Sequence, residues 1–435
     1  MATPQTNGMV IAALRGVGLA IPSLAILLAA CNAPRCAAET SPAEARAVAV
    51  VKSRGGSVAL DADGHVTAID LADRPATDAD LEAFVSLPRL ESLEVWGAEI
   101  TDRGIGSLAR IPGLKQLVLE NTDITDDGVR QLADAGHGGL KVLNLRRSTN
   151  LTDAALESVA RIGDLEQLVL LYNNFTDAGL AHLEPLKKLR VLDLRGCALV
   201  SDTGLEHVAA MASLERVKLR CPSVTDDGLA RLAELPKLRG FAAEDGQITD
   251  AGLAPFATKT DIDEINVMRT FVGDAGVAHL AGLGKLKRLE LRGTLVGDEG
   301  LAHVGRLTNL VLLDLAETGV GDAGVAHLGG LAKLAELDLW DTKVGDPGME
   351  TVGRLATLAK LNLQNTRVTD AGVGKLSGLG RLEALNLSGT KVSDAVLATL
   401  GGLAALKSLD VSFAPLSEAA VAAFGKAHPA VAITR

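Results

Sequence analysis

Residues 273–296 read GDAGVAHLAGLGKLKRLELRGTLV, and two segments of the same length and pattern follow directly: GDEGLAHVGRLTNLVLLDLAETGV (297–320) and GDAGVAHLGGLAKLAELDLWDTKV (321–344). A [Thr/Ser/Gly]-[Asp/Glu] pair opens fifteen such units, from Thr77 to Ser417. Two steps depart from the 24-residue period, with 27 residues before the unit at Thr152 and 25 before the unit at Ser201. A period of this size is typical of a solenoid, whose repeats stack only on their neighbours.

Each unit has two halves with different hydrophobic periods. In the half TDAGLAHLEPLKKL, Leu180, Leu183 and Leu186 recur at helical spacing after a Thr-Asp pair that suits a helix start. In the half LRVLDL, Leu192 and Leu194 alternate with outward residues, as in a strand with one buried face. A glycine recurs two residues after the Asp, where we expect neighbouring turns to approach too closely for a side chain: Gly104, Gly128, Gly179, Gly204, Gly276 and Gly324.

The pattern LxxLxLxx, followed by a turn and a helix, resembles the leucine-rich repeat, here the 24-residue bacterial kind with a GALA-like GLAHL helix. It is also similar to the repeat region of F-box/leucine-rich-repeat proteins. The resemblance covers residues 66–435 and implies an α/β solenoid, a horseshoe with a parallel β-sheet on the concave face and helices on the convex face. The usual Asn of the turn is mostly Thr, so we expect a threonine ladder: Thr270, Thr294, Thr318, Thr342, Thr366 and Thr390.

We divide the chain into a signal peptide (1–30), a lipidated Cys with a linker (31–41), an N-terminal cap (42–65) and about fifteen leucine-rich repeats (66–435). The cap is expected to hold a helix over residues 42–52 and then a hairpin, and residues 431–435 a last strand. A solenoid needs such caps because its terminal repeats would otherwise expose an apolar face. No F-box fits before the repeats, so a substrate-recognition role in a ubiquitin-ligase-like system is the least favoured function.

The N-terminal segment has the features of a bacterial export signal. The uncharged run from Gly16 to Ala30 is shorter than the ~17–25 residues of an ordinary membrane span but suits a signal peptide. Leu28-Ala29-Ala30-Cys31 resembles a lipobox, which implies lipidation of Cys31 and a membrane-anchored lipoprotein of the cell envelope, periplasmic or surface-exposed. The alternative is an ordinary secretory signal that is cleaved after Ala38.

The composition limits the classes of function. The formal net charge of -11 disfavours nonspecific nucleic-acid binding. Fifteen carboxylates belong to the repeat Asp/Glu column, and the remaining acidic residues are fewer than the 43 basic ones. The net charge therefore does not exclude an anionic partner. Cys197 and Cys221 lie in consecutive repeats, where one disulfide or two free thiols are both possible.

The sequence predicts no catalytic residue, metal site or cofactor. It contains no GxSxG, HExxH, CxxC or Walker motif. Five of the eight histidines belong to the consensus helix and are expected on the outer face: His182, His207, His279, His303 and His327. An enzyme with an unrecognised site is the remaining catalytic alternative. We expect a monomer that binds a protein partner.

The outward strand positions are the candidate binding surface, because the repeat consensus does not fix them. Both tryptophans and the single tyrosine fall there, with a basic cluster in the middle and acids around Trp340. The predicted partner-binding residues are Trp96, Arg146, Arg147, Leu171, Tyr172, Arg195, Arg216, Lys218, Arg220, Met268, Arg269, Arg292 and Trp340. The arginines would also suit an envelope scaffold or adhesin that binds an anionic polymer or glycan. Alternatively, these charges only pair across strands and keep the sheet soluble.

Overall fold

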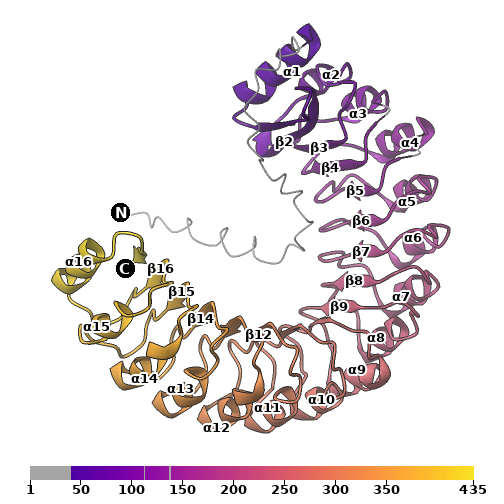
Figure 1. Cartoon of the computed structure of the whole chain (residues 1–435). Coiled ribbons are helices and arrows are strands. Elements are labelled where there is room, and N and C mark those ends of the chain that lie inside the picture. The colour runs from indigo at the N-terminus through magenta and orange to yellow at the C-terminus, as the bar shows by residue number, and fades with distance from the viewer. Residues whose placement is uncertain (1–40, 112, 137–138) are drawn as a thin grey trace, which may run out of the picture. The chain divides into compact units, whose positions relative to one another are not determined.

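A computed structural model describes residues 41–111, 113–136 and 139–435. These residues belong to one compact unit. Within it the repeats follow an arc, with the strands on the inner side and the helices on the outer side (Figure 1). The predicted signal peptide and Cys31 lie outside the described residues.

The described residues form one 17-stranded sheet. Its strands are β1 (Ser57–Leu60), β2 (Val66–Pro75), β3 (Ser92–Trp96), β4 (Gln116–Glu120), β5 (Val142–Asn144), β6 (Gln167–Val169), β7 (Val191–Asp193), β8 (Arg216–Leu219), β9 (Gly240–Ala243), β10 (Glu264–Asn266), β11 (Arg288–Glu290), β12 (Leu312–Asp314), β13 (Glu336–Asp338), β14 (Lys360–Asn362), β15 (Ala384–Asn386), β16 (Ser408–Asp410) and β17 (Ala432–Thr434).

Short helices separate the strands from β2 onward. The α-helices are α1 (Pro42–Ser53), α2 (Asp78–Glu82), α3 (Asp102–Leu108), α4 (Asp126–Asp134), α5 (Asp153–Val159), α6 (Asp177–Ala181), α7 (Asp202–Ala209), α8 (Asp226–Leu232), α9 (Asp250–Leu253), α10 (Asp274–Ala278), α11 (Asp298–Val304), α12 (Asp322–Val325), α13 (Asp346–Val352), α14 (Asp370–Gly374), α15 (Val396–Leu400) and α16 (Glu418–Ala427). Among the described residues, the 3-10 helices η2 (Ala254–Thr258), η3 (Ala326–Gly330) and η4 (Lys375–Gly378) extend α9, α12 and α14.

The strand pairing is that of a horseshoe. β1 and β2 form an antiparallel hairpin, and each later strand pairs in parallel with the next one along the chain. In the regular repeats, a residue lies opposite the residue 24 positions later, as Glu264 lies opposite Arg288. The parallel sheet on the concave face confirms the predicted fold class.

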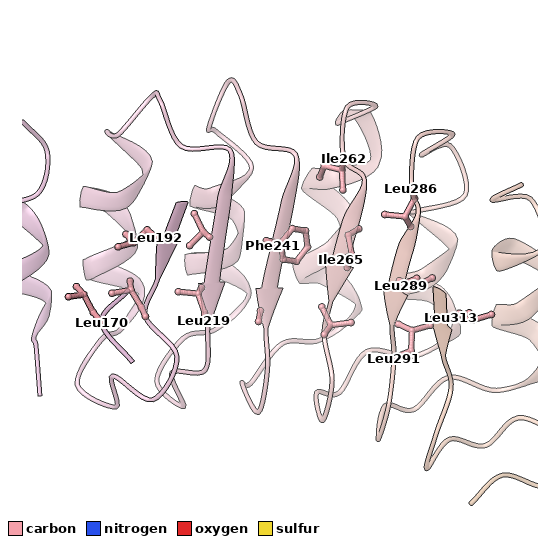
Figure 2. Close-up of a cluster of buried hydrophobic side chains, with 14 of the residues drawn as sticks. Leu170, Leu192, Leu219, Phe241, Ile262, Ile265, Leu286, Leu289, Leu291 and Leu313 are labelled. Atoms are coloured by element: carbon pink, nitrogen blue, oxygen red, sulfur yellow. The ribbon is translucent and has the colours of Figure 1, made fainter. Parts of the chain in front are cut away.

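The core lies between the sheet and the helices. The inward strand leucines, such as Leu192 and Leu289, and the helix leucines, such as Leu180, are fully buried. Figure 2 shows one stretch of this core, in which Phe241 of β9 and Ile265 of β10 continue the leucine rows of their neighbours. The predicted helix and strand periods therefore give the observed two-layer packing. The core continues along the arc rather than growing in width.

The repeat Asp connects successive repeats. The Asp102 carboxylate accepts hydrogen bonds from the backbone N–H (2.8 Å) and the hydroxyl (2.6 Å) of Thr125, which begins the next helix. The same pair recurs in most repeats that begin with Thr or Ser. The Thr125 hydroxyl also accepts from the backbone N–H of Asp127, two residues on. Sequence reading assigned these carboxylates to the starts of their own helices, whereas they fasten each helix start to the next one.

The recurrent glycine makes room for this carboxylate. A Cβ on Gly128 would overlap the Asp102 carboxylate, and a Cβ on Gly276 or Gly300 would overlap the carboxylate of the preceding repeat in the same way. The predicted close approach is thus confirmed, and its cause is the inter-repeat hydrogen bond.

The predicted threonine ladder is wrong in one respect. The Thr294 and Thr342 hydroxyls donate to the backbone carbonyls of Leu291 and Leu339, three residues earlier in the same repeat. Each of the six predicted threonines closes a turn of its own repeat in this way, whereas Thr122, at the same turn position, contacts Ser148 of the next repeat at 2.9 Å. Asn173 also links two repeats, because its longer amide donates to Leu145 O of the preceding repeat at 2.8 Å.

A capped helix begins the described part of the solenoid and a last parallel strand ends it. At the N-terminus, α1 spans Pro42–Ser53, and Ser41 and Glu44 form a capping box at its start. At the C-terminus, β17 adds the last strand to the sheet. Cys197 and Cys221 are buried and not bridged. In the part of the chain that the structure describes, no helix has the length and apolar character needed to cross a membrane.

Candidate functional site on the concave face

Every predicted partner-binding residue lies on the concave sheet or in the turns just after its strands. In the pattern LxxLxLxx, the third, fifth and seventh residues face outward and the fourth and sixth are buried. The parallel register places each outward residue beside the same position of the neighbouring repeats. The face is therefore read as columns that run along the arc.

The fifth column has a structural role that sequence reading missed. An Asp or Asn at this position accepts a hydrogen bond from the backbone N–H two residues later, which closes the strand end. Nine residues make this contact: Asp70, Asn144, Asp193, Asn266, Asp314, Asp338, Asn362, Asn386 and Asp410. The side chains of this column were expected to be available to a binding partner. Most of them instead accept a backbone hydrogen bond that closes the turn.

The eighth position is a left-handed turn. Its φ is near +55° at Arg147, Tyr172, Arg269 and Phe413, whereas several other repeats place Gly, Asn or Asp there. A large side chain in this conformation costs about 1 kcal/mol or more. Strained positions that keep large side chains are candidates for function. Three of the predicted site residues, Arg147, Tyr172 and Arg269, are of this kind.

The central arginines are neutralised by acids of their own repeat or of the repeat two further along. Arg195 contacts Asp193 (2.8 Å) and Glu244 (3.6 Å), and Arg216 contacts Asp263 and Glu264. These pairs are largely withdrawn from solvent. The expected basic surface at the centre is therefore a network of ion pairs, as the pairing alternative predicted.

The arginines at the margins of this cluster also form ion pairs with acids. Arg220 and Arg269 share the carboxylate of Asp245, and these two arginines hold its pKa below the usual range, chiefly through the hydrogen bond from Arg269. Arg146 lies 3.3 Å from Glu120. Lys218 is buried in the fifth column, and burial, followed by the nearby charge of Arg195, lowers the pKa of its ammonium group.

Large side chains cover small residues of the next repeat. Tyr172 lies over Gly196, where an added Cβ would overlap its ring, and Arg220 reaches the Tyr172 hydroxyl at 3.4 Å. The Arg147 guanidinium lies 5.2 Å from the centre of the Tyr172 ring. This group joins four repeats into one preorganised surface.

A second group surrounds Trp340. The Arg292 guanidinium lies 4.3 Å from the centre of the Trp340 ring and 2.6 Å from Glu317. Both side chains extend from the repeats on either side of Ala316, which is fully buried. The indole Nε1 of Trp340 is buried and has no hydrogen-bond partner. An unpaired buried donor costs about 1–3 kcal/mol, so this group is only partly satisfied.

Beside Trp340 the fifth column becomes a row of carboxylates. Glu290, Asp314 and Asp338 lie opposite one another on β11, β12 and β13. Burial, and then the charge of Asp338, raises the pKa of Asp314 to about 7. Burial also raises the pKa values of Glu290 and Asp338. Asp314 has a backbone hydrogen bond and forms no ion pair among the described residues, although the nearby charge of Arg292 partly offsets the rise in its pKa.

The remaining predicted residues are more isolated. Trp96 ends β3 and is half-buried, but no contact joins it to the other predicted residues. Leu171 and Met268 are half-buried at the seventh position. The structure thus brings together two groups, one around Tyr172 and Arg220 and one around Trp340 and Arg292.

The described residues offer no group of three or more His, Cys, Asp or Glu side chains that could hold a metal ion. Two shallow grooves on the outer face, between α4 and α5 and between α7 and α8, are lined mainly by charged side chains, among them Asp127, Arg161, Asp227 and Arg231. Neither groove lies near the concave face.

Comparison with known proteins agrees with this architecture. Residues 186–209 match the sequence family described as Leucine Rich repeat. An internalin (InlF) of Listeria monocytogenes is similar over 79% of this chain and 93% of its own, with 24% identity and a TM-score of 0.54. The chain folds as a leucine-rich-repeat solenoid. This solenoid is also similar to a leucine-rich-repeat protein of Leptospira interrogans, at 17% identity and a TM-score of 0.47, over 81% of this chain and 92% of that one. No curated protein matches the sequence significantly.

Sequence reading gave charge pairing across strands only as an alternative, and it did not identify several of the acids that neutralise the solenoid's arginines. The signal was present, because Asp245 and Arg269 stand 24 residues apart at the eighth position, and Arg292 and Glu317 stand 25 apart in neighbouring columns. A column-by-column comparison of charge between adjacent repeats would have found these pairs.

Proposed function

We propose that the chain is a non-catalytic protein-interaction module that binds its partner on the concave face, around Trp340. The leucine-rich-repeat fold supports protein interaction in general. The observation that supports this location is the unsatisfied polar group at Trp340, whose buried N–H has no acceptor while the carboxylate of Asp314 forms no ion pair among the described residues. A partner that supplies an acceptor and a positive group would satisfy both.

The central arginines are a weaker candidate for the binding site than the group around Trp340. Their acids are already bound, so an anionic polymer or glycan would have to break ion pairs such as Arg216–Glu264 (2.8 Å) before it could bind. No observation favours the adhesin alternative or the ubiquitin-ligase-like role over a protein partner.

Photo-crosslinking tests the proposed face. A photoreactive amino acid at Gln364, in the seventh column beside Trp340, should capture the partner in cells of the native host. The same group at His327, exposed on the outer side of the preceding repeat, is the matched control. Trp340→Ala should lower the yield at position 364 about tenfold or more, as expected for a buried aromatic contact. Equal yields from positions 364 and 327, or no effect of Trp340→Ala, would contradict the proposal.

We further propose that the protein is exported and anchored through lipidated Cys31. The support is sequence alone: an apolar run that ends in Leu28-Ala29-Ala30-Cys31. Mass spectrometry of the mature N-terminus should find a diacylglyceryl group on Cys31. A mature chain that begins after Ala38 would indicate the ordinary secretory signal, and one that retains residues 1–30 would refute export.

A further inference from the structure

One flank of the solenoid carries a row of six side-chain positions in register. They occupy the same place in the strand-to-helix loops of consecutive repeats: Phe271, Leu295, Gly319, Lys343, Arg367 and Lys391. Backbone hydrogen bonds hold each loop to the one before, as from Leu295 N–H to Val272 O (2.8 Å) and from Lys343 N–H to Val320 O (2.9 Å). We call these six positions the flank row. It is separate from the concave columns.

The first two positions of the flank row are apolar and exposed. Phe271 is 60% exposed and Leu295 is 67% exposed, on adjacent repeats. Most other large apolar side chains of the described repeats are buried in the core. Two neighbouring exposed side chains of this size need a partner more than single scattered ones do.

The last three positions are cations without partners. Lys343, Arg367 and Lys391 are exposed, and no ion pair or side-chain hydrogen bond engages them within the described chain. The concave arginines, by contrast, are bound by acids. Asp341 precedes Lys343 by two residues but forms no ion pair with it.

The neighbouring positions leave the cations accessible. Exposed small residues, Ala323, Pro347 and Ala371, stand at the helix starts beside the cationic loops. In the earlier repeats the equivalent loop positions are Glu99, Asp123, Asn150, Asn174, Leu199, Ser223 and Gln247, of which Leu199 is exposed and apolar and none is basic. An adjacent apolar pair combined with a basic row is therefore local to the repeats between residues 271 and 391.

We propose that the flank row binds an anionic lipid membrane surface. Phe271 and Leu295 would enter the boundary between headgroups and acyl chains, while Lys343, Arg367 and Lys391 lie against lipid phosphates. A soluble linear polyanion would engage the three cations but leave the apolar pair in water. The membrane is the occupant that uses both halves of the row.

Vesicle sedimentation of the purified full-length chain tests this proposal. Vesicles of phosphatidylglycerol and phosphatidylcholine in equal parts are compared with pure phosphatidylcholine vesicles. The apolar run at residues 16–30 would bind both kinds, so the difference between them is the readout. Each cation near an anionic surface contributes about fivefold in affinity, so Lys343→Gln, Arg367→Gln and Lys391→Gln together should reduce the anionic preference roughly 100-fold.

A triple variant of equal charge change is the control. Arg306, Arg354 and Arg381 are also exposed and without ion pairs in the described chain, but they lie in the helix-to-strand loops of the opposite flank. Replacing these three by Gln should leave the preference nearly unchanged. Phe271→Ser with Leu295→Ser should lower vesicle binding about tenfold.

Two results would overturn the proposal. Equal losses in the two triple variants would show that only net charge matters. Binding of soluble polyphosphate that depends on the three cations, together with no binding to anionic vesicles, would identify a polyanion site instead. Because Trp340 lies on the concave face, Trp340→Ala should not change vesicle binding, so failure here is distinguishable from failure of the proposed protein interface.

Discussion

Asp314 is a residue of the concave sheet whose surroundings disfavour the ionised form of its carboxyl group. Its carboxylate stands between those of Glu290 and Asp338 on adjacent strands and is mostly buried. Burial and the neighbouring charge raise its pKa to about 7, against an ordinary value near 4. The folded protein therefore holds this proton more tightly than the unfolded chain does.

The raised pKa of Asp314 makes the stability of the folded protein fall as pH rises. Because the folded-state pKa is raised, the contribution of Asp314 to stability is present at low pH and is lost as pH rises from about 4 to about 7. We expect the free energy of unfolding to fall in this window by up to about 1.4 kcal/mol per pH unit from this group. Urea unfolding at about pH 5 and about pH 8 measures it.

Asp314→Asn should remove this dependence. Asparagine already fills the fifth column at Asn362 and Asn386, where its side-chain oxygen accepts the same backbone hydrogen bond. The variant should be more stable than the wild type by about 1–2 kcal/mol at about pH 8. Asp410→Asn is the control, because Asp410 lies between Asn386 and Thr434 and has no acid beside it in the column. An unchanged pH slope in Asp314→Asn would mean that the carboxylate is not the cause.

At the scale of the element, the helix start is the joint between repeats. Where Thr begins the helix, its hydroxyl donates to the preceding Asp and accepts from its own second helical residue. Four consecutive repeats begin with Gly273, Gly297, Gly321 and Gly345, and only backbone N–H groups of these repeats bind that Asp. These helices have no side-chain cap.

Gly297→Thr should therefore strengthen its joint. Gly297 has φ −121° and ψ −160°, which suit threonine, and an added Cβ there would lie 3.4 Å from the nearest carboxylate oxygen of Asp274. The gained cap and inter-repeat hydrogen bond should raise the free energy of unfolding by about 1 kcal/mol, measured by urea unfolding. Gly297→Ala, which adds the Cβ without the hydroxyl, should gain less. If Ala and Thr gain equally, the effect is one of backbone entropy.

The neighbouring glycine of the same element gives the opposite result. A Cβ on Gly300 would overlap the Asp274 carboxylate, so Gly300→Ala should destabilise the protein although Ala favours helices in general. A loss of about 1–3 kcal/mol is expected in the same urea measurement. A neutral or stabilising effect would show that the carboxylate can move aside at little cost.

The elements could be predicted from the sequence because two periods repeat many times. The alternation of Leu192 and Leu194 and the helical spacing of Leu180 and Leu183 each specify one buried face, and their recurrence fixes the parallel register. The close approach at Gly128 followed from its regular spacing. These inferences needed only backbone geometry.

The details of the candidate site depended on side-chain reach, which periodicity does not give. The Thr294 hydroxyl binds a carbonyl of its own repeat, whereas the longer Asn173 amide reaches the preceding repeat, so the ladder prediction failed. The left-handed turn was hidden because its position holds Gly in some repeats and Arg or Tyr in others. The pairing of Arg195 with Glu244 crosses an intervening strand, which a comparison of adjacent repeats does not reveal.

At the scale of the whole molecule, stability depends on nearest-neighbour contacts along the arc. Each repeat contacts mainly the repeats beside it, so the ends should open more readily than the centre. Cys197 and Cys221 lie near the middle of the solenoid, so the reactivity of their thiols measures how often the central repeats open. Both are fully buried, and burial raises the pKa of each thiol to about 12.

Thiol labelling measures this difference between centre and end. In a chain with Cys31→Ser and Cys36→Ser, the central thiols should react with an aromatic disulfide reagent only when the central repeats open, because reaction needs an accessible thiolate. Thr390 occupies the same turn position as Cys197 and is also buried, close to the C-terminal end. A second chain that carries Thr390→Cys, with Cys197→Thr and Cys221→Thr, should label at least about tenfold faster in dilute denaturant, because opening from an end breaks one repeat interface where opening at the centre breaks two. Equal rates in the two chains would instead show that the solenoid opens as a single cooperative unit, so that the gain at a joint such as Gly297 would be shared along the entire arc.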